Sequence, residues 1–144
     1  MIGISSPSPV RPELPDGVLA ALRAHGERDW PREACGLVVI DASGCLAARP
    51  ARNLLDAHDA FLLDPAALLS ARRAGEMPVA IYHSHCDAPA TLSARDHAAA
   101  RIGDAPAWPG VDHLIVEVRA GRAGATRRYG WCPEAAALVT VGDR

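Results

Sequence analysis

The sequence lacks the features that mark membrane-bound, secreted and disulfide-rich proteins. It contains no run of about 18 apolar residues, so we expect no segment to span a membrane. The first residues, MIGISSPSPVRPELPDG, do not place basic residues before an apolar stretch, as a secretory signal would. The cysteines form no C-x-x-C pair, and we interpret them as reduced thiols of a cytoplasmic protein.

An excess of positive charge is also missing. The 15 basic and 17 acidic residues give a formal net charge of -2, which does not favour binding to nucleic acid. Hydrophobic residues make up 49% of the chain and charged residues 22%, so the chain can bury a core and is not expected to be disordered. A chain of 144 residues fits one domain. We expect this domain over 16–144, after a flexible, proline-rich lead-in over 1–15.

Helix and strand signals alternate along the rest of the chain. Helices are expected over 17–29 after a cap at Asp16, over 66–74 after Asp64-Pro65, and over 93–102 starting at Ser93. Strands are expected over 36–40, 45–53, 61–63, 78–85, 112–120 and 125–131, while 135–141 is compatible with either state. This order predicts a single α/β (α+β) domain with helices packed on a sheet.

Two histidines stand at the end of the strand expected over 78–85. His83 and His85 are two residues apart, so in a strand their side chains point to the same face. Two adjacent imidazoles suit one metal ion and would be poor packing partners in a dry core. A pair of partly exposed loop histidines would show the same spacing, so the pair alone leaves both interpretations open.

Ser93 and Asp96 follow the histidines closely. Ser-x-x-Asp before a helix is a variant of the capping box, but it also projects Asp96 back over the start of the helix. If that start meets the strand end, Asp96 completes a set of two histidines and one carboxylate, which zinc accepts with a fourth position left for water. Hydrolysis needs a general base, and Glu33, just before the strand at 36–40, is a candidate that alone would be an ordinary acidic residue.

The pattern His83-Ser-His85, seven residues, Ser93, two residues, Asp96 resembles the motif of the JAMM (MPN+) zinc metalloproteases. The stretch EACG, which begins at Glu33, and the apolar strand PVAIY before the histidines resemble the same family. The resemblance implies the JAB/MPN fold, a curved mixed β-sheet with flanking helices that is similar to the cytidine deaminase fold. This chain departs from the family where proline is common, at Cys86 and Leu92, which puts the stiffness of the loop over 86–92 in question.

The resemblance also implies a role for each residue of the motif. His83, His85 and Asp96 would bind one Zn²⁺ per chain. Glu33 would be the general acid/base, and Ser93 would donate a hydrogen bond to the oxyanion. The implied substrate is a ubiquitin-like β-grasp protein, cleaved after its C-terminal Gly-Gly, with E1-like and E2-like enzymes in the same pathway.

The sequence leaves several alternatives open. Some small prokaryotic relatives process sulfur-carrier proteins, for example by releasing cysteine from the C-terminus, and others belong to phage tails. The stretch HSHCD also begins like the H-x-H-x-D pattern of metallo-β-lactamases, in which Asp87 and not Asp96 would bind metal. A metal-free MPN scaffold is the alternative outside enzymes, although such modules have lost the ligands. Trp108, in a proline-rich loop, is a candidate for lining the substrate groove.

Overall fold

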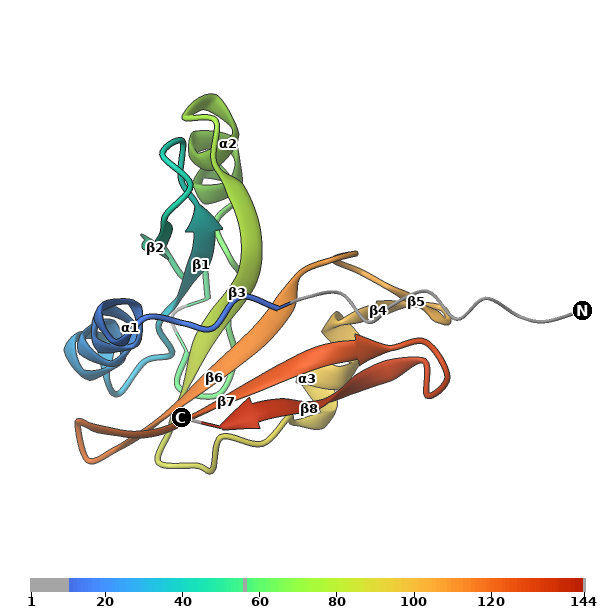
Figure 1. Ribbon diagram of the computed structural model, residues 1–144. Helices are drawn as coiled ribbons and strands as arrows, with labels where there is room; N and C mark the ends of the chain where they lie inside the picture. Colours follow the sequence, from blue (N-terminus) through green and yellow to red (C-terminus); the bar gives the residue numbers. More distant parts are fainter. Residues whose placement is uncertain (1–10, 56, 144) are drawn as a thin grey trace, which may run out of the picture.

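The structure, a computed structural model, describes residues 11–55 and 57–143. The first ten residues of the expected lead-in lie outside this range. A mixed sheet in the order β2-β1-β3-β6-β7-β8 curves through the molecule (Figure 1). Its strands are β1 (Cys35–Ile40), β2 (Leu46–Ala51), β3 (Met77–Cys86), β6 (Asp112–Arg119), β7 (Arg122–Cys132) and β8 (Ala137–Asp143). The helices are α1 (Asp16–Asp29), α2 (Pro65–Arg73) and α3 (Ala94–Ala99), and β4 (Arg101–Ile102) pairs with β5 (Ala105–Pro106) in a separate hairpin.

Strand β3 is the central strand that carries the two histidines. It pairs with β1 in the antiparallel sense and with β6 in the parallel sense. The register sets His83 opposite Cys35 on one side and opposite Ile115 on the other. A strand paired on both edges and covered on both faces must be apolar, which explains the run PVAIY before the histidines. The histidines therefore lie on an inner strand of the sheet, near its C-terminal end.

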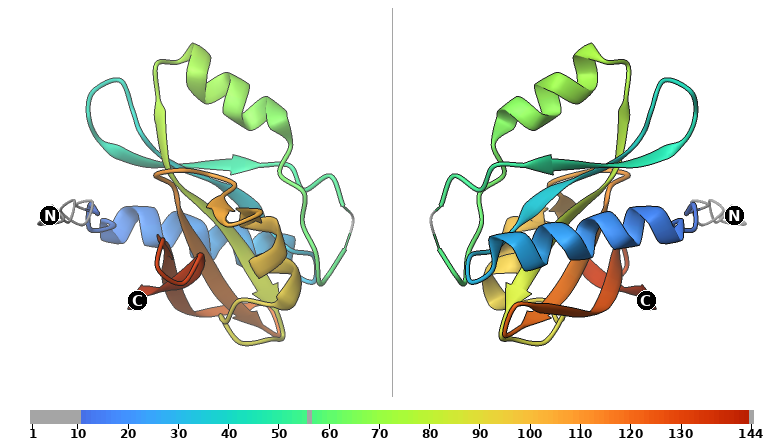
Figure 2. Two further views of the ribbon diagram at one scale, coloured as in Figure 1. Left: turned by 90° about the vertical axis from the view of Figure 1, so that its right-hand side faces the viewer. Right: turned by 90° about the vertical axis from the view of Figure 1, so that its left-hand side faces the viewer.

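Alternating side chains of β1 divide the core between the two faces of the sheet. Val38 packs in the cluster that includes Leu19 and Leu22 of α1. Leu37 and Val39 point the other way and pack with α2, as the period of two in a strand requires. Figure 2 shows α1 on one face of the sheet, with α2 and α3 on the other. The two histidines belong to the end of the sheet where β3 leads toward α3.

Gly36 is required by the packing of Tyr82 in the neighbouring strand. A Cβ added at Gly36 would lie 2.5 Å from the Tyr82 ring and hydroxyl. The Tyr82 hydroxyl lies 2.6 Å from Nδ1 of His25, whose Nε2 is 3.1 Å from a carboxylate oxygen of Asp29. The glycine of the EACG stretch thus makes room for a side chain that ties β3 to α1.

Gly36→Ala is expected to destabilise the fold by about 1–3 kcal/mol, because Tyr82 must shift and lose its bond to His25. Urea unfolding would measure the loss. Gly17→Ala is the matched control, because a Cβ added there meets no atom within 4 Å beyond its chain neighbours and the backbone of its own helix. It should leave stability unchanged or slightly raised. Equal losses in the two variants would contradict the role given to Tyr82.

Three expected elements differ in detail. Helix α1 already begins at Asp16 and its N-cap is Pro15, so Asp16 does not cap it. The expected strand over 61–63 is absent from the described residues, and Leu63 forms only an isolated bridge with Asn53. Helix α3 ends at Ala99, earlier than 102, because the next residues pair in the β4–β5 hairpin. The ambiguous segment over 135–141 contributes to β8, where it gains the backbone pairing of β7.

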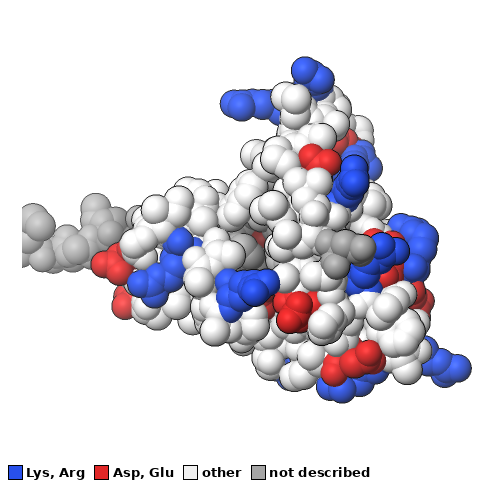
Figure 3. Space-filling view, turned by 180° about the vertical axis from the view of Figure 1, so that it is seen from behind, with Lys and Arg blue, Asp and Glu red and all other residues white. Residues whose placement is uncertain are grey.

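Residues just before α1 pack against the sheet. Nε of Arg11 lies 2.9 Å from a carboxylate oxygen of Asp112, and Leu14 is 6% exposed. No helix in the described part of the chain is both long and apolar enough to cross a bilayer. On the face seen in Figure 3, acidic and basic side chains are interspersed. That face presents no extended field of one sign.

Candidate metal centre

The two histidines at the end of β3 face each other. Their Nε2 atoms are 3.1 Å apart. His83 is 2% exposed, whereas His85 is half-buried. Nδ1 of His85 is 2.7 Å from the carbonyl oxygen of Pro89, so it carries the hydrogen that it donates there. In the neutral ring this leaves the Nε2 lone pair of His85 directed at His83.

Asp96 approaches both imidazoles from α3. Its Oδ1 is 3.4 Å from Nε2 of His83, and its Oδ2 is 3.1 Å from Nε2 of His85. A capping box holds it in place: Oδ2 accepts from the Ser93 N–H at 3.0 Å, and Oγ of Ser93 accepts from the Asp96 N–H at 3.1 Å. Because the Ser93 oxygen is the acceptor in this cap, its O–H hydrogen is left to donate elsewhere. Capping and metal binding are therefore compatible in the same residues.

This set of donor atoms fits a divalent metal such as zinc. The two imidazole nitrogens are 3.1 Å apart, and each lies 3.1 to 3.4 Å from a different oxygen of the Asp96 carboxylate. At these distances the lone pairs repel unless a cation or a proton lies between them. Burial lowers the pKa of His83, which keeps that ring neutral, as a metal ligand must be. Burial acts to raise the pKa of Asp96, but in the metal-free protein hydrogen bonds from His83 and from the protonated ring of His85 hold it far below its usual range. Burial acts to lower the pKa of His85, but its hydrogen bonds to Asp96 and the Pro89 carbonyl raise it overall, so metal binding would displace a proton from that ring. The residues present thus offer the ligand types that zinc needs.

Glu33 is a second carboxyl at this centre and is buried just before β1. Its Oε1 is 3.9 Å from Nε2 of His83, and its ligand atom and those of His83 and His85 lie within 4.8 Å of one another. Asp96 is closer and contacts both rings. Oε2 of Glu33 is buried without a hydrogen-bond partner among the described residues. Burial raises the pKa of Glu33 to about 8, so this carboxyl can both accept and return a proton near neutral pH.

The metal-free protein is expected to lose stability as the pH rises above 4.5, the ordinary pKa of Glu33. In the folded state Glu33 keeps its proton up to a pKa of about 8, whereas in the unfolded state it loses the proton near pH 4.5. The stability that Glu33 contributes is therefore fully present below pH 4.5 and is lost as the pH rises through 8. The total loss is roughly 4–5 kcal/mol. Urea unfolding of chelator-treated protein across this range would measure it, and Glu33→Gln should flatten the dependence. An equal loss in the variant would assign the titration to another group.

Cavities open on both sides of the centre. One of about 230 Å³ is lined mostly by apolar side chains, among them Phe61 and Trp108, together with the polar residues His83, Arg95, Asp96 and His113. The other, of about 290 Å³, is lined by polar groups, namely Glu33, Ser93, His85, His58 and Asp59, and by Cys86 and Ala88. Trp108, which the sequence suggested for a substrate groove, lies on the apolar side. The candidate acid/base and the candidate oxyanion donor both lie on the polar side.

Sequence reasoning missed Phe61 and His113. The Phe61 ring stacks on His83, with centroids 4.4 Å apart and ring planes 21° apart. His113 lines the same apolar cavity, and burial, with a smaller effect from His83, lowers its pKa to about 4. Neither residue has a local signal. Phe61 comes from the loop before α2, and His113 arrives through the parallel pairing of β3 with β6, in which it lies opposite Ile81.

Comparison with known families shows to which family the chain belongs. A family model described as prokaryotic homologs of the JAB domain matches residues 15–128. The chain belongs to this prokaryotic JAB-domain family. The JAB domain is 38% identical over 96 residues to a Thermus thermophilus protein named "Probable TtuB-protein conjugate cleaving protease". That match covers 61% of this chain and 62% of the relative, so it spans less than two thirds of either protein.

Two solution structures share the fold of the JAB domain. A protein from Salinibacter ruber has 27% sequence identity and a TM-score of 0.64, with 89% of this chain and 87% of that chain covered. A protein from Desulfitobacterium hafniense has 22% identity and a TM-score of 0.67, with 88% and 86% covered. The second supports the fold alone. The predicted curved mixed sheet with flanking helices is confirmed.

Asp87 points away from the metal centre of the JAB domain. Its Oδ2 accepts from Nε1 of Trp30 at 3.2 Å, and its Oδ1 accepts from the Ala120 N–H at 2.7 Å. Its own N–H donates to the carbonyl of Val118. The metallo-β-lactamase alternative needs Asp87 as a ligand and is therefore inconsistent with the structure.

The loop over 86–92 is held by tertiary contacts where the family often has proline. Besides the bonds of Asp87, the Tyr129 hydroxyl donates to the carbonyl of Ala90 at 2.6 Å. Ala90 is buried, and Leu92 packs against the cluster that contains Ala90 and Tyr129. Contacts with two other parts of the sheet thus supply the stiffness that the missing prolines put in question.

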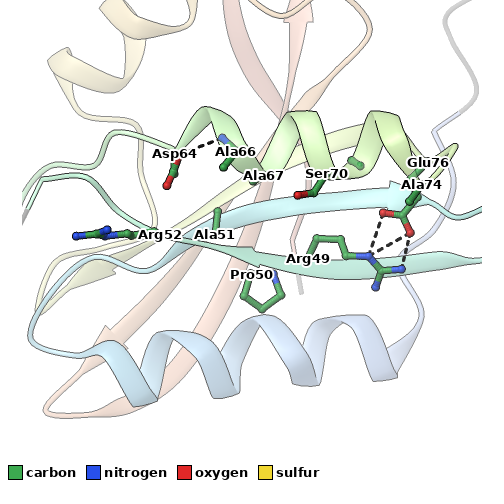
Figure 4. A pocket seen from close by; sticks show the side chains of 11 residues that line it. Arg49, Pro50, Ala51, Arg52, Asp64, Ala66, Ala67, Ser70, Ala74 and Glu76 are labelled. Carbon is green, nitrogen blue, oxygen red and sulfur yellow. Dashed lines mark hydrogen bonds and ion pairs between the residues drawn. The ribbon is translucent and has the colours of Figure 1, made fainter.

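A groove of about 580 Å³ between β2 and α2 lies apart from the histidines (Figure 4). Its described lining contains no histidine or cysteine. Three of its charged side chains are engaged locally: Arg49 pairs with Glu76 at 2.6 Å, and Asp64 caps α2 through the Ala66 N–H at 2.9 Å. Two residues disfavour the pairing of a further strand with the edge of β2 beside the groove. Pro50 has no N–H to donate, and Arg49 donates to the Ala48 carbonyl. This groove does not contribute to the candidate chemistry.

Proposed function

We propose that this JAB domain is a zinc-dependent peptidase that cleaves the amide bond after the C-terminal Gly-Gly of a ubiquitin-like β-grasp protein. The observation that carries the proposal is the meeting of Asp96 with His83 and His85, with the carboxyl of Glu33 buried beside them. The name of the Thermus relative, which refers to cleavage of protein conjugates, supports a substrate made of two joined proteins.

In this proposal His83, His85 and Asp96 hold the metal, which when bound supplies Lewis-acid polarisation of the scissile carbonyl and the attacking water. Glu33 accepts a proton from the water as the water oxygen bonds to the carbonyl carbon. The carbonyl electron pair moves to the oxygen, where the Ser93 O–H donates a hydrogen bond. When the C–N bond breaks, its electrons stay on nitrogen, and Glu33 returns the proton to that nitrogen.

The position of Glu33 suggests how the substrate is oriented. A general acid must reach the leaving nitrogen, so the leaving group belongs on the polar side that Glu33 lines. The acyl part then lies toward the apolar cavity lined by Phe61 and Trp108. Exposed Leu62 and Ile102 lie in the two segments that flank this side and offer apolar contacts for the body of a β-grasp protein.

Pairing of the Gly-Gly tail as an added strand of the main sheet is disfavoured. The free edges of that sheet belong to β2 and β8, whereas β3 is flanked by β1 and β6. Strand addition would place the tail away from His83 and His85. We therefore expect the tail to lie over the apolar cavity, where a narrow passage beside the metal favours glycine because it has no side chain.

We also propose that the peptidase acts in the cytoplasm, beside E1-like and E2-like enzymes that would build its substrate. The free state of all four cysteines supports a reducing compartment. Release of cysteine from the C-terminus of a sulfur carrier is the alternative reaction for the same site. A phage-tail role and a metal-free scaffold are the further alternatives.

The test uses β-grasp proteins that end in Gly-Gly, each carrying one of three leaving groups: a lysine isopeptide, a C-terminal cysteine or a linear peptide. The zinc-loaded enzyme should cleave at least one adduct after the second glycine, as intact mass spectrometry would show. Replacing the last glycine by alanine should block cleavage. Cleavage of the cysteine adduct alone would favour sulfur-carrier processing, and no cleavage of any adduct would overturn the proposal.

A further inference from the structure

One side chain, Asn53, makes four hydrogen bonds at the entrance to the loop over 53–63. We call this segment, in which residue 56 lies outside the described part, the Asn53 loop. Nδ2 of Asn53 donates to the Glu33 carbonyl at 3.0 Å and to the Ala60 carbonyl at 3.1 Å. Oδ1 accepts from the N–H groups of Leu55 and Leu62 at 2.9 and 3.0 Å. A primary amide of this kind has two donors and two acceptor lone pairs, so its capacity is fully used.

Both backbone groups of Glu33 are held by the Asn53 loop. Its carbonyl accepts from Asn53, and its N–H donates to the Ala57 carbonyl at 3.1 Å. Glu33 precedes β1, so these bonds replace the ladder pairing that a strand residue would have. The direction in which the Glu33 carboxyl projects therefore depends on a loop that comes after β2.

The C-terminal part of the Asn53 loop reaches the histidines. Asn53 bonds to Ala60 and Leu62, the two residues on either side of Phe61, and the Phe61 ring stacks on His83. Asn53 thus fixes the backbone on both sides of an aromatic ring that covers one imidazole. A single amide links the candidate base, the candidate ligand and the wall of the apolar cavity.

Closing the loop does not by itself require the donors of Asn53. The two ends of the loop are also joined by backbone hydrogen bonds, from the Leu54 N–H to the Leu62 carbonyl and from the Asp64 N–H to the Arg52 carbonyl. Within the described residues, the donor to the Glu33 carbonyl is Nδ2 of Asn53. A residue that served loop closure alone would have no need of this bond outside the loop.

We infer that Asn53 is a positioning residue, which sets the Glu33 backbone and the Phe61 face of the cavity for the reaction. The inference rests on the proposed function, in which Glu33 is the acid/base. Loss of the amide donors should let Glu33 drift from its place beside the metal while its carboxyl remains present. Misplacement of a reacting group by about 1 Å can cost on the order of 100-fold in rate.

The decisive variant is Asn53→Asp. It keeps an oxygen that accepts from Leu55 and Leu62, but sets a second oxygen against the carbonyls of Glu33 and Ala60. We expect kcat to fall roughly 10- to 100-fold, with KM and zinc content unchanged. Asn53→Ala should lower kcat similarly, and agreement between the two variants would exclude an effect of the new charge alone.

Asp64→Ala is the matched control, because it removes the cap of α2 at the other end of the loop without touching Glu33. It should lower the melting temperature while kcat per folded molecule stays at the wild-type value. If kcat in Asn53→Asp merely follows the folded fraction, as in this control, Asn53 is only structural and the inference fails.

A second readout does not depend on activity. In the metal-free protein, hydrogen exchange of the Glu33 amide should be clearly faster in Asn53→Asp than in wild type, and unchanged in Asp64→Ala. Equal Glu33 protection in wild type and Asn53→Asp would overturn the inference. A wild type that cleaves no β-grasp adduct would instead overturn the proposed function, and the exchange data would still decide whether Asn53 positions Glu33.

Discussion

Glu33→Gln is expected to lower kcat by about 10²- to 10⁴-fold while the purified protein keeps its metal. Glutamine has the size of glutamate but cannot accept a proton from water or return it to the leaving nitrogen. Metal should stay bound because Asp96 contacts both imidazoles, whereas Glu33 approaches His83 only to 3.9 Å. Initial rates on a cleaved β-grasp adduct and elemental analysis of zinc would give both quantities.

Glu76→Gln is the control for this substitution. Glu76 lies in the groove between β2 and α2, where it pairs with Arg49 away from the histidines. Its replacement should leave both kcat and zinc content unchanged. Loss of zinc from Glu33→Gln would instead make Glu33 a ligand, and full activity of that variant would assign the proton transfer to another group.

Asp96→Ala is expected to reduce bound zinc from about one ion per chain to nearly none, because two imidazoles remain without their carboxylate. Activity should be lost with the metal. The side chain of Asp96 also belongs to the capping box, so Ser93→Ala is needed to separate the two effects. That variant loses the cap as well, yet should keep its zinc, with kcat lower by roughly 10²- to 10³-fold for loss of the oxyanion donor.

Asp87→Ala completes the set, since Asp87 bonds to Trp30 and Ala120 and not to the histidines. It should keep its zinc and lose some thermal stability. Zinc that disappears with Asp87→Ala and persists in Asp96→Ala would reverse the assignment of the ligands. Absence of zinc from wild type, even after reloading with metal, would leave a scaffold and remove every catalytic role proposed for Glu33 and Ser93.

Local rules account for the elements that surround the centre. Asp64-Pro65 predicted the start of α2, and the Asp64 carboxylate does cap it. Ser93 and Asp96 predicted a capping box, and both of its hydrogen bonds are present. The length of α3 was overestimated because its end depends on the β4–β5 hairpin, which the helix pattern over 93–102 does not reveal.

Other residues reach the centre through contacts between segments that are far apart in the sequence. Asn53 and Phe61 lie in a loop in which a third strand was expected, and neither shows a pattern that points to His83 or Glu33. The sequence did not associate His113 with the motif, because its place beside His83 depends on the pairing of β6 with β3. Sequence periodicity does not reveal which strands pair. Asp87 matched a metal-binding pattern, but the β6–β7 turn and Trp30 use both of its carboxylate oxygens.

The sequence by itself determined which side chains of the motif can meet, because their relations are local. The period of two in a strand puts His83 and His85 on one face, and the geometry of a helix N-terminus turns Asp96 back over Ser93. Only the tertiary structure decided what surrounds them. Strand order and register bring Glu33 and His113 to the same centre, and the side-chain amide of Asn53 joins its loop to the Glu33 backbone. Such contacts depend on pairing between distant segments, which the local spacing of residues does not contain.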